Sequence, residues 1–159
     1  MNYLVTGGTG FLGSHLVKRL VGLDNKVTVV STFIRDKTSF KALNIDSDGV
    51  NLIKGDVRNF DFLRQLFNEY EFDYVYHLGA ISEVRKCQGD AKLAYDVNIG
   101  GTVNVLECAR LYGDVKGIAV SSSDKAYGNG VVPYLEDQPL DGKGIYEASK
   151  SCTDIVARS

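Results

Sequence analysis

Tyr146 and Lys150 combine two residue types and a spacing that suit proton transfer. They lie four residues apart in a segment, from Ile145 onward, whose apolar residues recur at helical spacing. Their side chains should therefore share one helical face, with Cβ atoms roughly 5–6 Å apart. A free tyrosine has a pKa of about 10, so half-ionisation at pH 7 requires a shift of about 3 units, or roughly 4 kcal/mol. A nearby ammonium supplies part of that shift, so the pair predicts a tyrosine base assisted by a lysine.

A hydroxyl, a carboxylate and an amine follow one another at Ser123, Asp124 and Lys125. They come directly after an apolar run, residues 117–122, that predicts a strand. On a regular strand Asp124 and Lys125 would point to opposite faces, so the chain must turn here if both are to reach one substrate. The alternative is an exposed Asp–Lys pair in a loop.

Three glycines near the N-terminus, Gly7, Gly10 and Gly13, separate an apolar run, 2–6, from a periodic apolar segment, 11–21. In such a strand–turn–helix the first glycine permits a tight turn and the second lets the backbone approach a pyrophosphate. The third allows the helix to pack closely on the strand. The positive end of the helix then points at the phosphates. In this context the motif predicts a dinucleotide site, with an ordinary strand–helix turn as the alternative.

The residue expected to bind the ribose of such a dinucleotide is not acidic in this chain. Dinucleotide-binding domains place an acidic residue at the end of the second strand, and that position is Ser31. Arg35 could pair with a 2′-phosphate or lie in a solvated loop, so the residues leave the choice between NAD and NADP open. Asp56 could accept a hydrogen bond from an adenine amino group, or it could serve a turn beside Asn59.

The order of predicted elements alternates between strands and helices. Near-continuous apolar runs predict strands, and helical periodicity with capping residues predicts helices. The predicted strands are 2–6, 26–31, 50–54, 73–77 and 117–122; the predicted helices are 11–21, 39–43, 60–70, 90–113 and from 145 onward, with a loop over 79–89. This order is typical of a parallel sheet covered on both faces, so we expect an α/β, Rossmann-like, doubly wound fold.

The length of 159 residues predicts one domain. The last predicted helix reaches Ser159 without a cap or a stop signal. We therefore expect residues 1–159 to be a dinucleotide-binding domain that is truncated before the later strands of its sheet. A short natural domain is the alternative.

Composition argues against several other classes of protein. With 18 basic and 20 acidic residues the net charge is −2, which predicts no nucleic-acid partner. No apolar run approaches the ~20 residues of a membrane span, and the N-terminus has no leader pattern. Cys87, Cys108 and Cys152 are odd in number and widely spaced, which predicts free thiols in a cytoplasmic protein. With only two histidines we expect no metal site, and we expect His77 to be a structural histidine.

Taken in order, these motifs resemble the extended short-chain dehydrogenase/reductase family of nucleotide-sugar epimerases and dehydratases. The resemblance covers the whole chain and is carried by residues 6–13, Gly55-Asp56-Val57, His77-Leu78-Gly79-Ala80, Asn98 with Gly101-Thr102, residues 121–128, and Tyr146 with Lys150. It implies bound NAD, with NADP not excluded, a nucleotide-activated hexose as substrate, and a C-terminal substrate-binding part beyond this chain. It also implies cofactor contacts from Gly7, Gly10, Phe11, Leu12, Gly13, Ser31, Asp56, Val57, Leu78, Gly79, Ala80, Asn98, Tyr146 and Lys150.

Within that family, residues 122–128 resemble the 4,6-dehydratases, such as the enzymes that act on CDP-glucose. This chain reads Ser-Ser-Asp-Lys-Ala-Tyr-Gly, with an acid and a base after the serine. The simple 4-epimerases resemble Ser-Ser-Ser-Ala-Thr-Val-Tyr-Gly there and carry no charge in the middle. The resemblance therefore favours dehydration over epimerisation.

In such a dehydratase the resemblance implies roles for five residues. Tyr146 takes the proton of the sugar 4-hydroxyl while Ser123 hydrogen-bonds that oxygen, and Lys150 holds the cofactor ribose and lowers the Tyr146 pKa. A hydride passes from C4 to the cofactor and returns to C6. Lys125 removes the C5 proton and Asp124 protonates the departing 6-hydroxyl. Two alternatives remain: a 4-epimerase in which Asp124 and Lys125 are spectators, and a cofactor-binding module without catalytic activity.

The resemblance also implies a homodimer. The helix over 90–113 and the helix that carries Tyr146 would pair with their copies in a four-helix bundle. The apolar residues that fit this arrangement are Leu93, Val97 and Val105 on the first helix and Cys152, Ile155 and Val156 on the second. Packing within the core of one chain accounts for them equally well.

Overall fold

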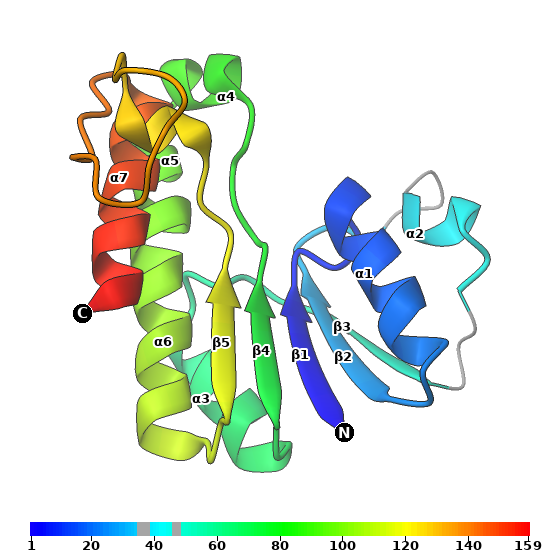
Figure 1. Ribbon diagram of the computed structural model, residues 1–159. Helices are drawn as coiled ribbons and strands as arrows, with labels where there is room; N and C mark the ends of the chain where they lie inside the picture. The colour runs from blue at the N-terminus through cyan, green and yellow to red at the C-terminus, as the bar shows by residue number, and fades with distance from the viewer. Residues whose placement is uncertain (35–38, 46–48) are drawn as a thin grey trace.

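A five-stranded parallel sheet forms the centre of the molecule (Figure 1). The computed structural model describes residues 1–34, 39–45 and 49–159. The strands lie in the order β3-β2-β1-β4-β5, and every neighbouring pair is parallel. Their bounds are β1 Asn2–Thr6, β2 Lys26–Ser31, β3 Val50–Lys54, β4 Tyr74–His77 and β5 Gly117–Val120. This confirms the α/β, Rossmann-like fold, whose strand order reverses between β1 and β4.

The middle strand, β1, is apolar towards both faces of the sheet. Leu4 and Val5 are both fully buried and belong to different cores, because successive side chains of a strand alternate between faces. Leu4 shares its core with residues of α3 (Phe60–Glu69) and α6 (Gly101–Tyr112). Val5 shares its core with residues of α1 (Phe11–Val21). The continuous apolar runs in the sequence thus reflect a sheet that is covered on both faces.

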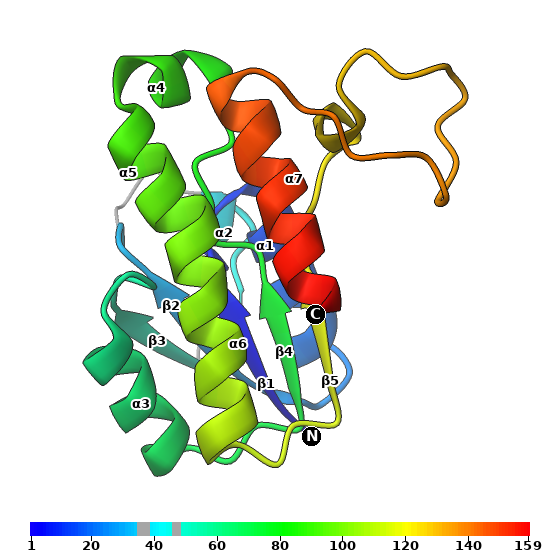
Figure 2. The same ribbon diagram turned by 90° about the vertical axis from the view of Figure 1, so that its left-hand side faces the viewer.

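Helices form a layer on each side of the sheet (Figures 1 and 2). On one side α1 packs with the short α2 (Ser39–Ala42). On the other side lie α3 and a rod made of α5 (Ala91–Tyr95), a π-helical segment η1 (Asp96–Gly100) and α6. The last helix, α7 (Ile145–Arg158), runs beside this rod. Because all strands point the same way, the turns after β1, β3, β4 and β5 meet at one edge of the sheet, at the top of Figure 1.

Two of the predicted elements differ in the structure. The loop predicted over 79–89 contains a short helix, α4 (Val84–Gly89). Only Cys87 of α4 is buried, so the sequence has too few apolar positions there to show a helical period. The strand predicted over 117–122 ends at Val120, and after a short extended stretch the chain forms a 3₁₀ turn, η2 (Asp124–Tyr127).

The predicted long helix that starts after Asp90 is confirmed, but its middle is π-helical. Asp90 Oδ1 accepts a hydrogen bond from the backbone N–H of Leu93 at 2.9 Å, as expected of an N-cap. Asn59 caps α3 in the same way, and its Oδ1 accepts from the N–H of Phe62 at 3.0 Å. A local change from α to π winding leaves the apolar pattern almost unaltered, so the pattern did not indicate η1.

β4 ends at His77, a buried histidine that joins three elements. Thr6 Oγ1 of β1 lies 2.7 Å from His77 Nδ1, and Thr102 Oγ1 of α6 lies 3.1 Å from Nε2. The Thr102 hydroxyl donates its only hydrogen to the carbonyl of Asn98 at 2.6 Å, so it accepts from Nε2–H, and Nδ1 accepts from Thr6. This arrangement requires a neutral ring. Burial, with a smaller contribution from the charge of Lys150, lowers the pKa of His77 to about 4. His77 is thus the structural histidine that the sequence predicts.

The titration of His77 should make stability depend on pH. In the unfolded chain the histidine has its ordinary pKa of 6.5, so below that pH the unfolded state takes up a proton that the folded state does not. The free energy of unfolding should fall by about 2–3 kcal/mol from this group between pH 7 and pH 4.5. Urea unfolding of the parent and of His77→Gln at both pH values measures the effect.

The His77→Gln variant should be less stable than the parent at pH 7, because it disturbs the bonds to the two threonines, yet lose less stability on acidification. The matched control is His15→Gln at an exposed position, which should keep the parent's pH dependence. An equal loss on acidification in the parent and in His77→Gln would rule out this role for His77.

Candidate active site

The glycine turn between β1 and α1 has the three geometries that the sequence predicts. Gly7 has φ of 70°, and a Cβ there would lie 2.8 Å from the backbone nitrogen of Gly79. A Cβ at Gly13 would lie 2.4 Å from the Gly7 carbonyl oxygen, so the helix can pack this closely only on glycine. A Cβ at Gly10 would meet one atom, the Gly7 oxygen at 3.2 Å, so this glycine faces open space. Gly8 also needs to be a glycine, which was not predicted, because a Cβ there would lie 2.7 Å from Val29 Cγ1.

The N-terminus of α1 is open to an anion. Its N-cap is Gly10, so no side chain caps the helix, and its first turn contains no acidic residue. The backbone N–H groups of this turn carry the positive end of the helix dipole. Phe11 and Leu12 flank the turn and are 77% and 63% exposed, although both are large and apolar. An uncapped helix end between exposed apolar side chains fits a dinucleotide, whose pyrophosphate and rings would cover it.

The loop after β4 runs directly past this turn, at the point where the strand order reverses. The backbone N–H of Leu78 donates to the Thr6 carbonyl at 3.1 Å, and the N–H of Gly79 donates to Thr6 Oγ1 at 3.1 Å. Ala80 follows and is half-buried. The structure therefore brings together residues 7–13 and 78–80, two segments that the sequence predicts to contact the cofactor.

At the end of β2, Ser31 is bonded to the glycine turn. Its Oγ lies 2.6 Å from Thr9 Oγ1. Both hydroxyls also lie within hydrogen-bond distance of the Phe33 carbonyl, Thr9 at 3.1 Å and Ser31 at 3.2 Å. Arg35, the predicted partner of a 2′-phosphate, lies outside the described residues.

Asp56, after β3, is held by Arg58. The guanidinium contacts both carboxylate oxygens, with Nη2–Oδ2 at 2.6 Å, and the Arg58 N–H donates to Oδ1 at 2.9 Å. The hydrogen bonds from Arg58 lower the pKa of Asp56, so the carboxylate is ionised. An open hollow of about 600 Å³ lies beside this pair. The turn role of Asp56 is thus present in the structure, and its contact with adenine stays a prediction.

Val57, the next predicted contact, is buried against the rod of α5, η1 and α6. A Cβ at Gly101 would lie 2.5 Å from Val57 Cγ2, so Gly101 lets the rod approach the loop after β3. The Asn104 side chain fixes the same loop, because its Nδ2 donates to the Val57 carbonyl at 3.0 Å. This role of Asn104 was not predicted from the sequence.

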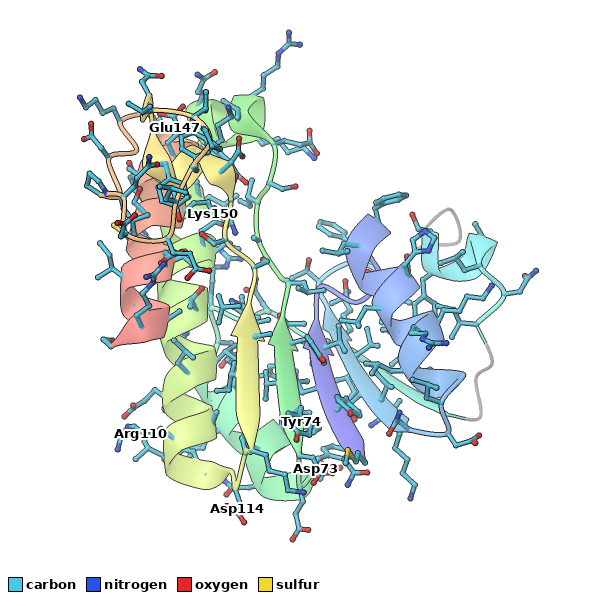
Figure 3. The ribbon with its side chains drawn as sticks, viewed as in Figure 1. Asp73, Tyr74, Arg110, Asp114, Glu147 and Lys150 are labelled. Carbon is cyan, nitrogen blue, oxygen red and sulfur yellow. The ribbon has the colours of Figure 1, made fainter. Side chains whose placement is uncertain are left out.

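Polar contacts hold α7, which carries Tyr146 and Lys150, against the rest of the site. Lys150 is only 3% exposed, and its Nζ donates to the Ser121 carbonyl, just after β5, at 2.9 Å. Burial lowers the pKa of Lys150. Ser151 Oγ donates to the carbonyl of Ala126 in η2 at 2.8 Å. Figure 3 shows Lys150 at the sheet end to which the strand arrows point, and Asp73 at the opposite end.

Tyr146 lies on the first turn of α7 and is half-buried. Glu147 fixes the start of this helix, because its Oε2 accepts from the Gly144 N–H at 2.8 Å. Within the described ranges no residue hydrogen-bonds the phenol oxygen of Tyr146, so that oxygen is available to a substrate. The i, i+4 placement of Tyr146 and Lys150 on one helix is confirmed.

The chain turns at Ser123, as the sequence requires if Asp124 and Lys125 are to serve one substrate. Ser123 Oγ accepts from the N–H of Lys125 at 3.2 Å and donates to Asp124 Oδ1 at 3.1 Å, so it caps η2. Lys125 Nζ lies 3.7 Å from Asp124 Oδ2, and both side chains are more than half exposed. Because η2 is bonded to α7 through Ser151, the two sets of candidate catalytic residues belong to one assembly.

Asn98, in the π-helical segment, links α7 to the loop after β4. Its side chain is 1% exposed; Oδ1 accepts from the Ile81 N–H at 2.8 Å, and Nδ2 donates to the Ile81 carbonyl and to Ser149 Oγ. The Asn98 carbonyl accepts from Thr153 Oγ1 at 2.8 Å. Through these bonds Asn98 positions α7 against the loop after β4. Its contact with a cofactor stays a prediction. The contacts of Ser149 and Thr153 were not predicted. The available signal was two hydroxyl side chains that lie four residues apart on the buried side of one helix.

The remaining site predictions concern metals, membranes and thiols. The described parts of the chain hold no group of three His, Cys, Asp or Glu residues placed to bind a metal ion. In residues 1–34, 39–45 and 49–159 no helix is both long and apolar enough to cross a bilayer. Cys87, Cys108 and Cys152 are free thiols, as predicted, and Cys152 is the exposed one of the three.

A family model and curated relatives match nearly the whole chain. The model described as GDP-mannose 4,6 dehydratase matches residues 4–159. UDP-glucose 4-epimerase of Neisseria meningitidis serogroup A is 34% identical over 98% of this chain and 47% of its own length. CDP-glucose 4,6-dehydratase of Salmonella typhimurium is 32% identical over 96% of this chain and 43% of its own length. The chain therefore spans about half the length of these relatives.

Solved structures with the same fold include both kinds of enzyme. DesIV, a dTDP-glucose 4,6-dehydratase from Streptomyces venezuelae with NAD bound, is 30% identical with a TM-score of 0.87, over 99% of this chain and 51% of the other. UDP-glucose-4-epimerase from Stenotrophomonas maltophila with NAD bound is 26% identical with a TM-score of 0.86, over 98% and 47%. The chain belongs to the extended short-chain dehydrogenase/reductase family of NAD-dependent epimerases and dehydratases.

Proposed function

We propose that residues 1–159 form the NAD-binding domain of a nucleotide-sugar 4,6-dehydratase. The observation that carries the proposal is the turn at Ser123-Asp124-Lys125, which supplies an acid–base pair and is bonded to the helix of Tyr146 and Lys150. The family model, described as a 4,6 dehydratase, supports it, as do a 4,6-dehydratase relative and a 4,6-dehydratase structure with NAD.

In this proposal the residues at the edge of the sheet hold the cofactor. Gly10 and the N-terminus of α1 would hold the pyrophosphate, because no side chain competes there for the N–H groups. Asp56 accepts from the adenine amino group, and Lys150 donates one of its ammonium hydrogens to the nicotinamide ribose. When bound, NAD supplies a hydride acceptor for the sugar C4 and returns the hydride to C6.

Tyr146 and Ser123 act on the sugar 4-hydroxyl. Ser123 Oγ hydrogen-bonds the sugar oxygen, and the Tyr146 phenolate takes its proton. The ammonium of Lys150 lies one helical turn away, in a position where burial strengthens its electrostatic effect on the phenol. The resulting 4-ketone acidifies the hydrogen on C5.

Asp124 and Lys125 then catalyse the loss of water. Lys125 takes the C5 proton, and Asp124 protonates the 6-hydroxyl, which leaves as water; the hydride enters at C6 and Lys125 returns a proton to C5. Lys125 must start neutral and Asp124 protonated. A proton passed along the pair, now 3.7 Å apart and exposed, achieves this once bound substrate excludes water, because a dry site favours the neutral forms.

A 4-epimerase is the second candidate. UDP-glucose 4-epimerases are among the relatives, at 34% identity, and among the structures with the same fold. In this function Tyr146, Ser123 and Lys150 act as above, while Asp124 and Lys125 remain an exposed ion pair. A domain that binds NAD without turnover is the third candidate, because the chain spans about half of its relatives.

Product analysis separates the three candidates. The full-length enzyme that contains residues 1–159 is incubated with NAD and with CDP-, UDP-, GDP- and dTDP-activated hexoses, and the products are examined by mass spectrometry and chromatography. A 4-keto-6-deoxy product, one water lighter than its substrate, is expected for one of the four nucleotides. A product of unchanged mass with the opposite C4 configuration would support the epimerase and contradict dehydration. NAD binding without conversion would support the binding domain.

Substitution of Asp124 tests the role of the turn. Asp124→Asn keeps the shape but removes the acid, so dehydration should fall by about 10²–10⁴-fold while the affinity for NAD stays the same. Asp141→Asn is the matched control, because Asp141 also pairs with a lysine, Lys143, in an exposed loop. Turnover of Asp124→Asn equal to that of Asp141→Asn would make Asp124 a spectator. Tyr146→Phe should abolish turnover under either enzymatic candidate.

We also propose that the protein forms a homodimer through the rod and α7. The prediction needs one correction: Val105 is fully buried in the core, so it cannot face a second copy. The exposed large apolar residues on these helices are Tyr95, Val103, Leu111, Tyr112 and Ile155. Sedimentation should give a dimer at micromolar concentration, and Ile155→Lys should give a folded monomer. A parent that sediments as a monomer would contradict the proposal.

A further inference from the structure

The end of β2 offers a pair of hydroxyl groups where a dinucleotide site of this fold usually offers a carboxylate. Ser31 Oγ and Thr9 Oγ1 are 2.6 Å apart, one from the strand and one from the glycine turn. Thr9 is 8% exposed, and Ser31 is partly exposed. The pair therefore lies beside the open N-terminus of α1, with Ser31 as its exposed member.

The hydrogen bonds of this pair can be arranged in two ways. The Phe33 carbonyl is within reach of both hydroxyls, so both hydrogens can point inward, with Thr9 donating to that carbonyl and Ser31 donating to Thr9. Ser31 Oγ then offers a lone pair outward and can accept from a ribose 2′-hydroxyl. If Thr9 instead donates to Ser31 Oγ, the Ser31 hydrogen is free to point outward and can donate to a phosphate oxygen. A carboxylate can accept from a ribose hydroxyl, but it has no hydrogen to donate to a phosphate oxygen.

An acidic residue and a serine at this position also differ in charge. A phosphate monoester carries about −1.5 to −2 charges at pH 7, so a carboxylate at this position would repel the 2′-phosphate of NADP. Ser31 and Thr9 carry no charge, and the nearby N-terminus of α1 presents the positive end of its dipole. The carboxylate that would repel NADP is therefore replaced in this chain by a hydroxyl group that can bind it.

We propose, on the basis of the dinucleotide site in the proposed function, that Ser31 and Thr9 give this chain comparable affinity for NAD and NADP. Ser31 is the specificity-determining residue, because its Oγ is the exposed member of the pair. The NAD seen in structures with the same fold does not decide this point, since the inference rests on the side chain present in this chain.

Calorimetric titration of the protein with NAD and with NADP tests the proposal. The two dissociation constants of the parent should agree within about tenfold, which corresponds to 1.4 kcal/mol. Ser31→Asp should raise the ratio of the NADP constant to the NAD constant by about 100-fold or more, because the new carboxylate repels the 2′-phosphate. Ser31→Ala is the matched control: it adds no charge, so the ratio should stay within about tenfold of unity while both affinities fall slightly. Circular dichroism and the melting temperature confirm that each variant is folded.

The possible results separate this inference from the proposed function. A parent that prefers NAD by more than about tenfold overturns the inference, and so does a Ser31→Asp variant with an unchanged ratio. Failure to bind either cofactor overturns both the inference and the dinucleotide site. Binding of both cofactors with no conversion of any nucleotide hexose supports the inference and contradicts the dehydratase.

Discussion

A chain of buried hydrogen bonds fixes α7, the helix that carries Tyr146 and Lys150, relative to the glycine turn. It runs from Thr6 at the end of β1 through His77 and Thr102 to the carbonyl of Asn98, which also accepts from Thr153 of α7. Every member is buried, so each unmade bond would leave a desolvated polar group at a cost of about 1–3 kcal/mol. A buried network whose hydrogen bonds are all made specifies one arrangement of the elements that it joins. The π-helical segment η1 supplies the Asn98 carbonyl, which accepts from Thr102 of α6 and from Thr153 of α7.

Parallel strands and charge placement explain why the candidate site lies at one edge of the sheet. The carboxyl ends of all five strands meet there, so segments more than a hundred residues apart become neighbours. The positive end of α1 and the buried amine of Lys150 lie at this edge. The ion pair between Lys116 and Asp73 lies at the opposite edge, on the surface, where solvent screens it. The electrostatic features that could act on a bound anion are thus gathered on one side.

Much of the fold could be predicted because a sheet that is buried on both faces requires continuous apolar runs in its strands, and these runs are visible in the sequence. The strands 2–6, 26–31 and 50–54 and the helix 11–21 match the structure residue for residue. The turn after Ser123 also followed from stereochemistry, since a strand cannot aim two adjacent side chains at one ligand. The contact of Ser31 with Thr9 could not be predicted, because it joins residues 22 apart through tertiary structure. The role of Ser149 was missed for the same reason: a serine on a helix is polar by type and reveals its burial only through a partner such as Asn98.

The similarity of one chain to both epimerases and dehydratases has a physical explanation. In the proposed functions both reactions begin by removing a proton and a hydride at C4, and the edge of the sheet, the glycine turn and α7 would serve that shared step. Dehydration would need in addition an acid and a base that reach C5 and C6, and η2 places a carboxylate and an amine, Asp124 and Lys125, next to each other. Overall identities of 34% to an epimerase and 32% to a dehydratase therefore carry little information about the reaction. In the proposed function the distinction depends on the two side chains of η2 after β5, because function depends on the residues of a site and not on the fold that carries them.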